Sequence, residues 1–405
     1  MKKLYFLALI LPLSLFAKSY LISSIPTPKN MILNLDPTPC DTECLQQYLK
    51  DGFIFSFLAY ADHKLDDTAL EKAKEEYWAI FNGKKVTPQE KIRIALLLPY
   101  KKIARYAAST TNASFAYLMS KGYPFELKSY KIEDETQAEI SNALKKIQDD
   151  GFKYVIAPLT QDGEAVVSKI DPQINIFFPT INKKESQSNS KFLYYGGIDY
   201  NAQSDMLIDQ AAAPLVIFYD ESDIGKQLTA YQESAYRSQD SKKQTIIKFP
   251  IPQRITNLED KLKDNRRVQG GSFVINTPIV KSAMVLSQLT LYDANPTNIL
   301  STQTNYNPLL LSMTQYRDRK NMVIANSITH HNDEIIEVNS FLSNDIVYEW
   351  INYTTTIGVD YFSNIMSGQN RAYAIEMQNN QMSYPIVLVK PSVSKFIPFD
   401  SNAEE

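Results

Sequence analysis

The chain has 405 residues, of which 44% are hydrophobic, so it is long enough for two or three domains and apolar enough to form a buried core. Its formal net charge of −3 provides no overall attraction to nucleic acid or to anionic lipid. We therefore expect no nucleic-acid partner.

Residues 1–17 have the pattern of a secretory signal peptide. Two lysines supply a positive start, residues 4–16 form an apolar run, and Ala17 is the small residue that a signal peptidase requires. The alternative is a membrane anchor, but this run is too short to cross a hydrocarbon layer of about 30 Å. No cysteine follows the run to carry a lipid. We expect cleavage before Lys18 and a periplasmic location. No later stretch approaches about 18 continuous apolar residues, so no transmembrane segment is expected after cleavage.

The chain contains two cysteines, Cys40 and Cys44. In an oxidising compartment, an isolated pair this close in sequence is a disulfide candidate. Two ligands do not complete a structural zinc site, and the C-x-x-x-C spacing differs from the C-x-x-C of thiol oxidoreductases. Asp41 is a suitable N-cap, which places Cys40 just before a helix and Cys44 in its first turn. We expect a structural disulfide between Cys40 and Cys44.

Residues 41–82 carry apolar side chains at helical spacing, interrupted by polar stretches. We expect a small helical extension over residues 18–88, which must pack on another part of the chain or on a partner because it is too small to be stable alone. Phe53, Phe55 and Phe57 form a candidate docking stripe. The alternative is that these side chains pack into the core of the extension.

From residue 91 onward, strands alternate with helices. The expected strands span residues 92–99, 125–132, 154–159, 174–179, 192–197, 214–219, 245–249 and 272–276. The expected helices span residues 103–122, 135–150, 163–170, 200–212, 224–236, 258–262 and 279–291. This alternation is typical of α/β proteins in which helices cover both faces of parallel sheets. We predict a body over residues 89–399 with two lobes, the first over about 89–212 with a later return of the chain and the second from about 213.

Five segments resemble the type I periplasmic-binding-protein superfamily in sequence and in order. They are residues 94–99, 151–159, 174–179, 214–219 and 357–362. The first four match strands of the superfamily, and the last resembles the helix that carries its Gly-x-Asp-Ala-x segment. Within the superfamily, the chain is similar to the amino-acid-binding receptors and to the C-terminal domain of the penicillin-binding-protein activator lipoproteins. The resemblance implies a two-lobed fold for about residues 91–399.

The resemblance also implies a ligand cleft between the lobes. Ligand-binding members usually follow the first strand with a glycine-containing loop, whereas residues 100–105 of this chain are bulky and glycine-free. In open parallel sheets, ligands bind beyond the carboxyl ends of the strands. The candidate cleft residues at those ends are Tyr100, Lys101, Thr160, Gln161, Thr180, Asp220 and Thr277. These residue types suit a small polar ligand, but they also serve as ordinary loop and cap residues.

The sequence offers no catalytic constellation. His330 and His331 are adjacent in a polar stretch and lack the i, i+4 spacing of helical metal ligands, so a surface loop is favoured over a metal or pH-sensing site. No nucleophile elbow, phosphate-binding loop or dinucleotide fingerprint occurs. A basic cluster is mixed with acidic residues, which is typical of a solvated face; it consists of Arg254, Lys261, Lys263, Arg266 and Arg267. We expect no enzyme activity, no metal and no cofactor.

These features favour a non-catalytic periplasmic scaffold that uses a binding-protein fold to contact an envelope protein, because a free solute receptor needs no helical extension. By analogy with the activator lipoproteins, the partner would act in peptidoglycan synthesis or in another envelope machine, such as a motility apparatus. The alternative is a solute-binding or sensing protein for an amino acid or a similar small polar ligand. An open cleft with convergent polar groups would favour that alternative.

The mature protein is expected to begin near Lys18 and to fractionate with the periplasm, because residues 1–17 carry a cleavable signal pattern. Amino-terminal sequencing of the protein from fractionated cells checks this. An intact residue 1–17 segment on membrane-bound protein would overturn the predicted location.

Overall fold

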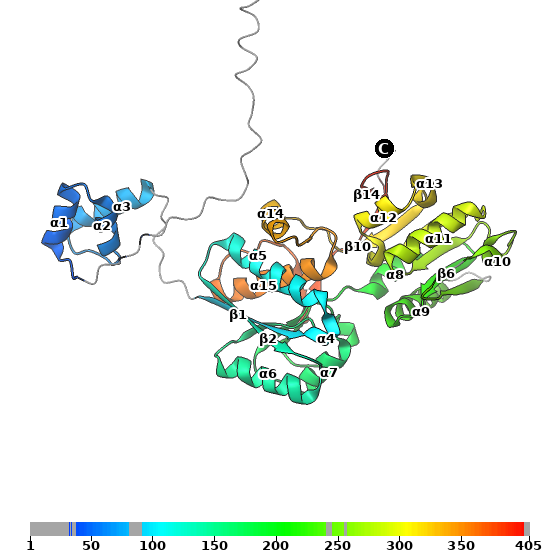
Figure 1. The fold of residues 1–405 in the computed structure, drawn as a ribbon, viewed down its shortest axis with the longest axis horizontal. Helices are drawn as coiled ribbons and strands as arrows, with labels where there is room; N and C mark the ends of the chain where they lie inside the picture. Colours follow the sequence, from blue (N-terminus) through cyan, green and yellow to red (C-terminus); the bar gives the residue numbers. More distant parts are fainter. Residues whose placement is uncertain are drawn as a thin grey trace, which may run out of the picture. The chain divides into compact units, whose positions relative to one another are not determined.

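The structure is a computed structural model that describes residues 32, 34, 38–80, 91–239, 245–254 and 257–400. The described residues divide near residue 90 into two compact units, a helical N-terminal unit and an α/β body (Figure 1). The expected signal peptide, residues 1–17, lies outside the described residues.

Three helices form the N-terminal unit: α1 (Thr42–Lys50), α2 (Ile54–Tyr60) and α3 (Thr68–Ile80). Their apolar faces enclose a small core that consists of Leu45, Phe57, Leu58, Ala61, Leu65 and Leu70. Phe57 is fully buried, whereas Phe53 and Phe55 are 57% and 63% exposed. Of the three phenylalanines in the candidate docking stripe, one therefore belongs to the core and two lie at the surface.

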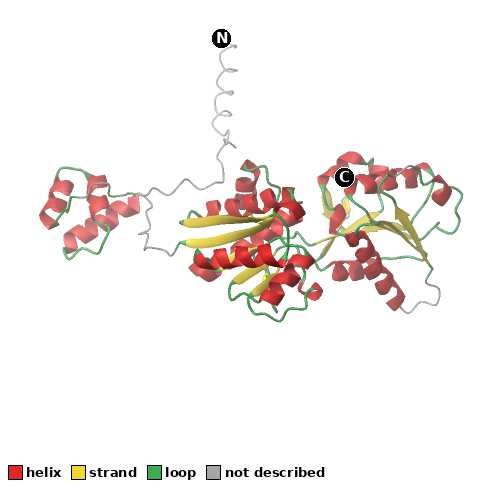
Figure 2. Cartoon of the chain, turned by 60° about the horizontal axis from the view of Figure 1, so that its bottom comes forward, coloured by secondary structure: helices red, strands yellow, loops and turns green. Residues whose placement is uncertain are grey.

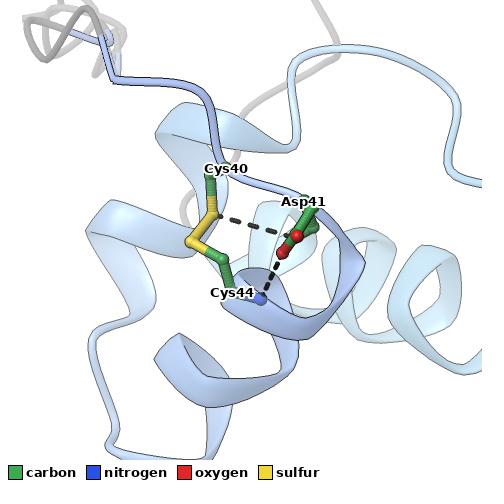
Figure 3. The surroundings of a disulfide bond; sticks show 3 residues. All are labelled: Cys40, Asp41 and Cys44. Carbon is green, nitrogen blue, oxygen red and sulfur yellow. Dashed lines mark hydrogen bonds between the residues drawn. A yellow bond between two sulfur atoms is a disulfide. The ribbon is translucent and has the colours of Figure 1, made fainter.

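The expected disulfide between Cys40 and Cys44 is present at the start of α1 (Figure 3). Asp41 is the N-cap, and its Oδ1 accepts a hydrogen bond from the Cys44 backbone N–H at 3.0 Å. The disulfide and this hydrogen bond hold the same helical turn. Because the bridge closes a loop of only a few residues, it constrains the unfolded chain little and its effect is local.

The first sheet of the body has seven strands in the order β11-β12-β5-β4-β3-β1-β2. They are β1 (Ile92–Pro99), β2 (Phe125–Ile132), β3 (Tyr154–Ile156), β4 (Asn175–Phe178), β5 (Leu193–Tyr195), β11 (Glu376–Gln378) and β12 (Gln381–Ser383). Neighbouring strands are parallel, except that β11 and β12 are antiparallel. Strand β1 is buried over residues 94–98, as expected for a parallel strand with helices on both faces.

The second sheet has the corresponding order β14-β13-β10-β9-β8-β6-β7. Its strands are β6 (Leu215–Asp220), β7 (Ile246–Ile251), β8 (Ser272–Asn276), β9 (Asn298–Ser301), β10 (Met322–Asn326), β13 (Val387–Pro391) and β14 (Phe396–Pro398). The two sheets thus form two similar α/β lobes, which confirms the predicted fold class. Both sheets are mixed rather than wholly parallel, because β13 runs antiparallel to β10 and to β14, just as β11 runs antiparallel to β12.

Helices lie on both faces of each sheet (Figure 2). Through the first half of the body they are α4 (Tyr100–Ile103), α5 (Arg105–Lys121), α6 (Gln137–Asp149), α7 (Gln161–Ile170), the 3₁₀ turn η2 (Lys183–Glu185), α8 (Tyr200–Ile208) and α9 (Asp223–Ser238). They continue with α10 (Glu259–Leu262), α11 (Ile279–Leu291), η3 (Gln303–Asn305), α12 (Pro308–Met313), α13 (Tyr316–Arg319), α14 (Asp333–Phe341) and α15 (Trp350–Ser367). None of the helices within the described ranges is long and apolar enough to cross a membrane.

One element differs from the sequence-based expectation, and the contacts of another helix bear on where the second lobe begins. The segment after β1, expected to be a loop, is the short helix α4, and Ala104 separates it from α5 with a backbone φ of 43°. Helix α8 packs against α9 and β10 of the second lobe. We therefore propose that the second lobe begins before α8 rather than near residue 213.

Helix α15 returns the chain to the first lobe, where it packs against β1 and β3 and lies beside α5 (Figure 1). The helix can approach the sheet closely at Gly358, because a Cβ at this position would lie 2.4 Å from Cδ1 of Phe177. Two residues along, the buried Asp360 accepts hydrogen bonds from the Tyr117 hydroxyl at 2.8 Å and from Arg371 Nε at 2.9 Å. Burial and the neighbouring carboxylate raise the pKa of Tyr117, so its hydroxyl remains a donor.

Replacement of Gly358 by alanine is expected to destabilise the body by about 1–3 kcal/mol, because the added methyl group overpacks the contact with Phe177. Chemical denaturation followed by circular dichroism measures the change. The double variant Gly358→Ala with Phe177→Leu should recover part of the loss, since the smaller side chain gives the methyl group room. A single variant as stable as the wild type would contradict the packing described for α15.

Candidate functional site

A cavity of about 340 Å³ lies where residues that follow the strand ends of the two lobes converge. Its walls come from the segments that follow β1, β3 and β4, from the segment after β5 with the start of α8, and from the start of α9, which follows β6. The lining residues are Lys102, Ile103, Tyr106, Pro158, Leu159, Thr160, Gln161, Thr180, Ile181, Glu185, Ile198, Tyr200, Ile224 and Gln227. This is the position at which α/β sheets generally bind ligands, and we take it as the candidate cleft.

Thr160, Gln161 and Thr180 line this cavity, whereas the other four sequence-predicted cleft residues do not. Tyr100 and Lys101 belong to α4 and face β2. The Lys101 ammonium forms an ion pair with Glu133, which raises the pKa of the lysine, and Lys131 lies 4.8 Å from the Tyr100 ring centre. The space beside β1 is filled instead by Lys102, Ile103 and Tyr106.

Asp220 and Thr277 are buried at the ends of β6 and β8. Asp220 accepts a hydrogen bond from the Ser222 hydroxyl at 2.6 Å, and the Thr277 hydroxyl is 2.8 Å from that of Ser282. Glycine at position 225 allows the backbone of α9 to lie against Asp220, because a Cβ at this position would be 2.4 Å from the aspartate. These residues stabilise the starts of α9 and α11, which is the cap role that their residue types also allow.

Thr160 is the N-cap of α7, and its polar groups are occupied by Glu135. The Thr160 backbone N–H donates to Glu135 Oε1 at 2.8 Å, and its hydroxyl donates to Glu135 Oε2. A helix N-terminus attracts anions, and here the anion is a carboxylate of the same chain. Gly163 makes room for it, since a Cβ at that position would lie 2.7 Å from Glu135 Cδ.

Most other polar groups that line the cavity also have partners within the chain. The Thr180 hydroxyl donates to the Leu159 carbonyl at 2.8 Å, and Lys102 lies 3.6 Å from Asp134. Gln227 donates to Glu185 at 3.0 Å, and this hydrogen bond joins the two lobes across the cavity. The cavity thus presents few free hydrogen-bonding groups to a ligand.

Sequence reasoning missed Tyr106, Glu185, Tyr200 and Gln227. Tyr106 follows the first strand closely, and its position beyond that strand end is the signal that could have found it. The other three lie in turns or helices that follow strands and carry no distinctive motif. Burial raises the pKa of the Tyr200 phenol, with Glu185 adding to the effect, so this side chain is a neutral polar group.

His330 and His331 lie in the segment between β10 and α14. The His330 backbone N–H donates to the Tyr353 hydroxyl at 3.3 Å, and burial together with His330 lowers the pKa of His331. No group of three or more metal-ligating side chains occurs within the ranges that the structure describes. In the basic cluster, Lys263 forms an i, i+4 ion pair with Glu259.

No protein-family model matches the chain, and no curated protein matches it significantly. Solved structures do match. The isoleucine complex of the branched-chain amino acid transporter substrate-binding protein LivJ from Streptococcus pneumoniae has a TM-score of 0.55 at 10% identity and covers 76% of this chain and 98% of its own. A putative branched-chain amino acid ABC transporter protein from Rhodospirillum rubrum has a TM-score of 0.59 at 10% identity and covers 76% of this chain and 100% of its own.

The body has the type I periplasmic-binding-protein fold. LpoA of Haemophilus influenzae also matches, with a TM-score of 0.51 at 10% identity over 89% of this chain and 72% of that one. The neighbours therefore include both kinds of protein that the sequence resembles, solute-binding proteins and an activator lipoprotein. At these identities the likeness concerns the fold.

Replacement of Glu135 by alanine is expected to lower the free energy of unfolding by about 1–3 kcal/mol, because the cap of α7 loses two hydrogen bonds to a charged group. Glu133→Ala is the matched control, since Glu133 is exposed and its ion pair with Lys101 should contribute less than about 1 kcal/mol. Denaturant titration of both variants measures the difference. Equal stability of the two variants would show that Glu135 does not hold α7.

Proposed function

We propose that the protein is a non-catalytic accessory protein of the periplasm that uses its two-lobed fold to bind an envelope protein rather than a solute. The observation that carries this proposal is the pairing of the cleft groups within the chain. Thr160 is engaged by Glu135, Thr180 by the Leu159 carbonyl, and Gln227 by Glu185. A ligand that entered the cleft would have to break these bonds or leave them without new partners, which costs free energy.

Exposed apolar side chains on the second lobe supply a surface for a protein partner. They lie on α11 and α12 and are Val280, Met284, Leu291, Leu309 and Met313. On α11 they follow helical spacing along one face, and Leu291 is 67% exposed. Contiguous apolar surface of this kind is typical of protein–protein contacts.

The match to LpoA supports the same proposal. The match covers 89% of this chain, which is more than residues 91–400 alone could account for. It therefore also includes residues N-terminal to the body. The two solute-binding neighbours described above cover 76% of the chain. An activator lipoprotein that resembles the chain beyond the two lobes favours a partner in peptidoglycan synthesis or in another envelope machine.

The alternative function, binding of an amino acid or another small polar ligand, is favoured by the cavity itself. Its volume of about 340 Å³ lies at the lower end of the range of ligand pockets, about 300–1,000 Å³. Gln161 lines it, and no hydrogen bond joins the Gln161 side chain to another described residue. One neighbour of the same fold, from Rhodopseudomonas palustris, is a solute-binding protein in complex with 3,4-dihydroxybenzoic acid, with a TM-score of 0.57 at 9% identity.

If the protein binds an envelope protein rather than a solute, a thermal-shift screen with amino acids, small peptides and aromatic acids should give no stabilisation that depends on the cleft. A cleft ligand at one hundred times its dissociation constant would stabilise the protein by about 2.7 kcal/mol, which is easily measured. Ile224→Arg fills the cavity from the second lobe and serves as the blocked control. A reproducible shift that this variant abolishes would make the protein a receptor.

A photo-crosslinking residue at position 291 is expected to form an adduct with one envelope protein in living cells, because this position lies on the exposed face of α11. The same residue at position 145, on the exposed side of α6, is the matched control. Mass spectrometry identifies the adduct. Equal labelling from both positions, or none from position 291, would contradict an interaction through α11.

A further inference from the structure

A second cavity, of about 670 Å³, lies in the first lobe between α7 and the segment that follows η2. Three carboxylates line it (Glu164, Asp171 and Glu185), together with one cation, Lys169. The remaining lining residues are serine, asparagine and glutamine, with a single alanine. Large apolar and aromatic side chains are missing from this lining, so the walls suit a strongly polar molecule.

Glu164 is the unusual member of the lining, because it is an acidic residue that is only 4% exposed. Its Oε1 accepts hydrogen bonds from the hydroxyls of Ser168 at 2.6 Å, Ser186 at 2.8 Å and Tyr195 at 2.8 Å. These three donors come from α7, from the segment after η2 and from β5, and they hold the carboxylate in one orientation. Its Oε2 accepts no hydrogen bond from any described residue.

No cation among the described residues forms an ion pair with Glu164. The Lys183 ammonium donates to the Ser188 carbonyl and lies 4.9 Å from the Tyr195 ring centre. Burial lowers the pKa of Lys183, and Glu164 is near enough to oppose this shift, but the two groups are not in ion-pair contact. A buried carboxylate is costly unless a cation or further hydrogen-bond donors satisfy it. The cavity therefore contains a preorganised acceptor whose second oxygen has no partner within the described chain.

We propose that this cavity binds a small, hydroxyl-rich or otherwise polar molecule through a primary ammonium group, which donates to Glu164 Oε2. An amino sugar and the side chain of a diamino acid both carry this group. Asp171 and Glu185 at the walls add negative potential, and the serine, asparagine and glutamine side chains provide hydrogen bonds for the rest of the ligand. Anionic ligands would meet three carboxylates and one lysine, so the charge balance disfavours them.

This site adjoins the cleft but is distinct from it. The two cavities share Gln161 and Glu185, but Glu164 lines the second cavity and does not line the first. The proposal does not rest on the proposed function, since a protein-binding scaffold and a solute receptor could each carry such a site.

The test is a calorimetric or NMR titration of the mature full chain with glucosamine and with cadaverine. The neutral N-acetylglucosamine is the matched control ligand, because it retains the sugar hydroxyls and lacks the charge. Glucosamine should bind with a dissociation constant on the order of 1 mM or tighter, and N-acetylglucosamine should bind at least about tenfold more weakly, equivalent to about 1.4 kcal/mol. Binding of cadaverine alone would assign the site to a diamine rather than to an amino sugar and would still support an ammonium site.

Glu164→Gln keeps an acceptor for the three hydroxyls and removes the charge, and it should weaken glucosamine or cadaverine binding at least tenfold. Asp162→Asn is the control variant, since Asp162 is exposed on the same helix and does not line the cavity. If Glu164→Gln does not fold, the double variant Asp171→Asn with Glu185→Gln, at the less buried walls, should weaken binding several-fold. The proposal is overturned if neither ammonium probe binds, if N-acetylglucosamine binds as well as glucosamine, or if the cavity variants bind like the wild type.

Discussion

The arrangement of the body depends on the return of the chain through α15, which covers the first sheet with a helix from the far end of the sequence. Gly358 lets the α15 backbone meet Phe177 of β4. The buried Asp360 then joins Tyr117 of α5 to Arg371, which precedes β11. Removing one partner from a buried charged pair costs about 3–5 kcal/mol. This carboxylate therefore links three segments that are distant in sequence, and the first lobe is incomplete without them.

The same return makes the two lobes interdependent. The chain passes from the first sheet to the second between β5 and β6, comes back after β10, and leaves again between β12 and β13, so each sheet contains strands from two parts of the sequence. A buried network fixes the segment that leaves β10: Gln203 donates to the Ser327 hydroxyl at 2.8 Å, and the Ser327 backbone N–H donates to Gln303 at 2.6 Å. These crossings bring the strand ends of both lobes to one cavity.

The two cavities differ in how the chain satisfies their buried polar groups. At the cleft between the lobes, the helix N-terminus at Thr160 already holds a carboxylate of the same protein, Glu135, and Thr180 is bound to backbone. At the second cavity, three hydroxyls orient Glu164 through one oxygen and leave the other without a partner among the described residues. A satisfied polar group stabilises the fold, whereas an oriented and unsatisfied one is available for binding. By this criterion, the fold's customary ligand position is the less suited of the two to bind a ligand.

The sequence by itself determined the features that depend on neighbouring residues. The alternation of strands and helices predicted the two-lobed α/β body. Asp41 predicted the helix start, and the close spacing of Cys40 and Cys44 predicted the disulfide, because caps and short loops are local. The rule that ligands bind beyond strand ends correctly selected Thr160, Gln161 and Thr180 of the cleft. The sequence could not show that Tyr100 and Lys101 turn toward β2. Only the tertiary structure placed α15 on the first sheet, Glu135 under Thr160, and the hydroxyls of Ser186 and Tyr195 on Glu164. Each of these contacts joins residues that different elements bring together, so local periodicity carries no trace of them.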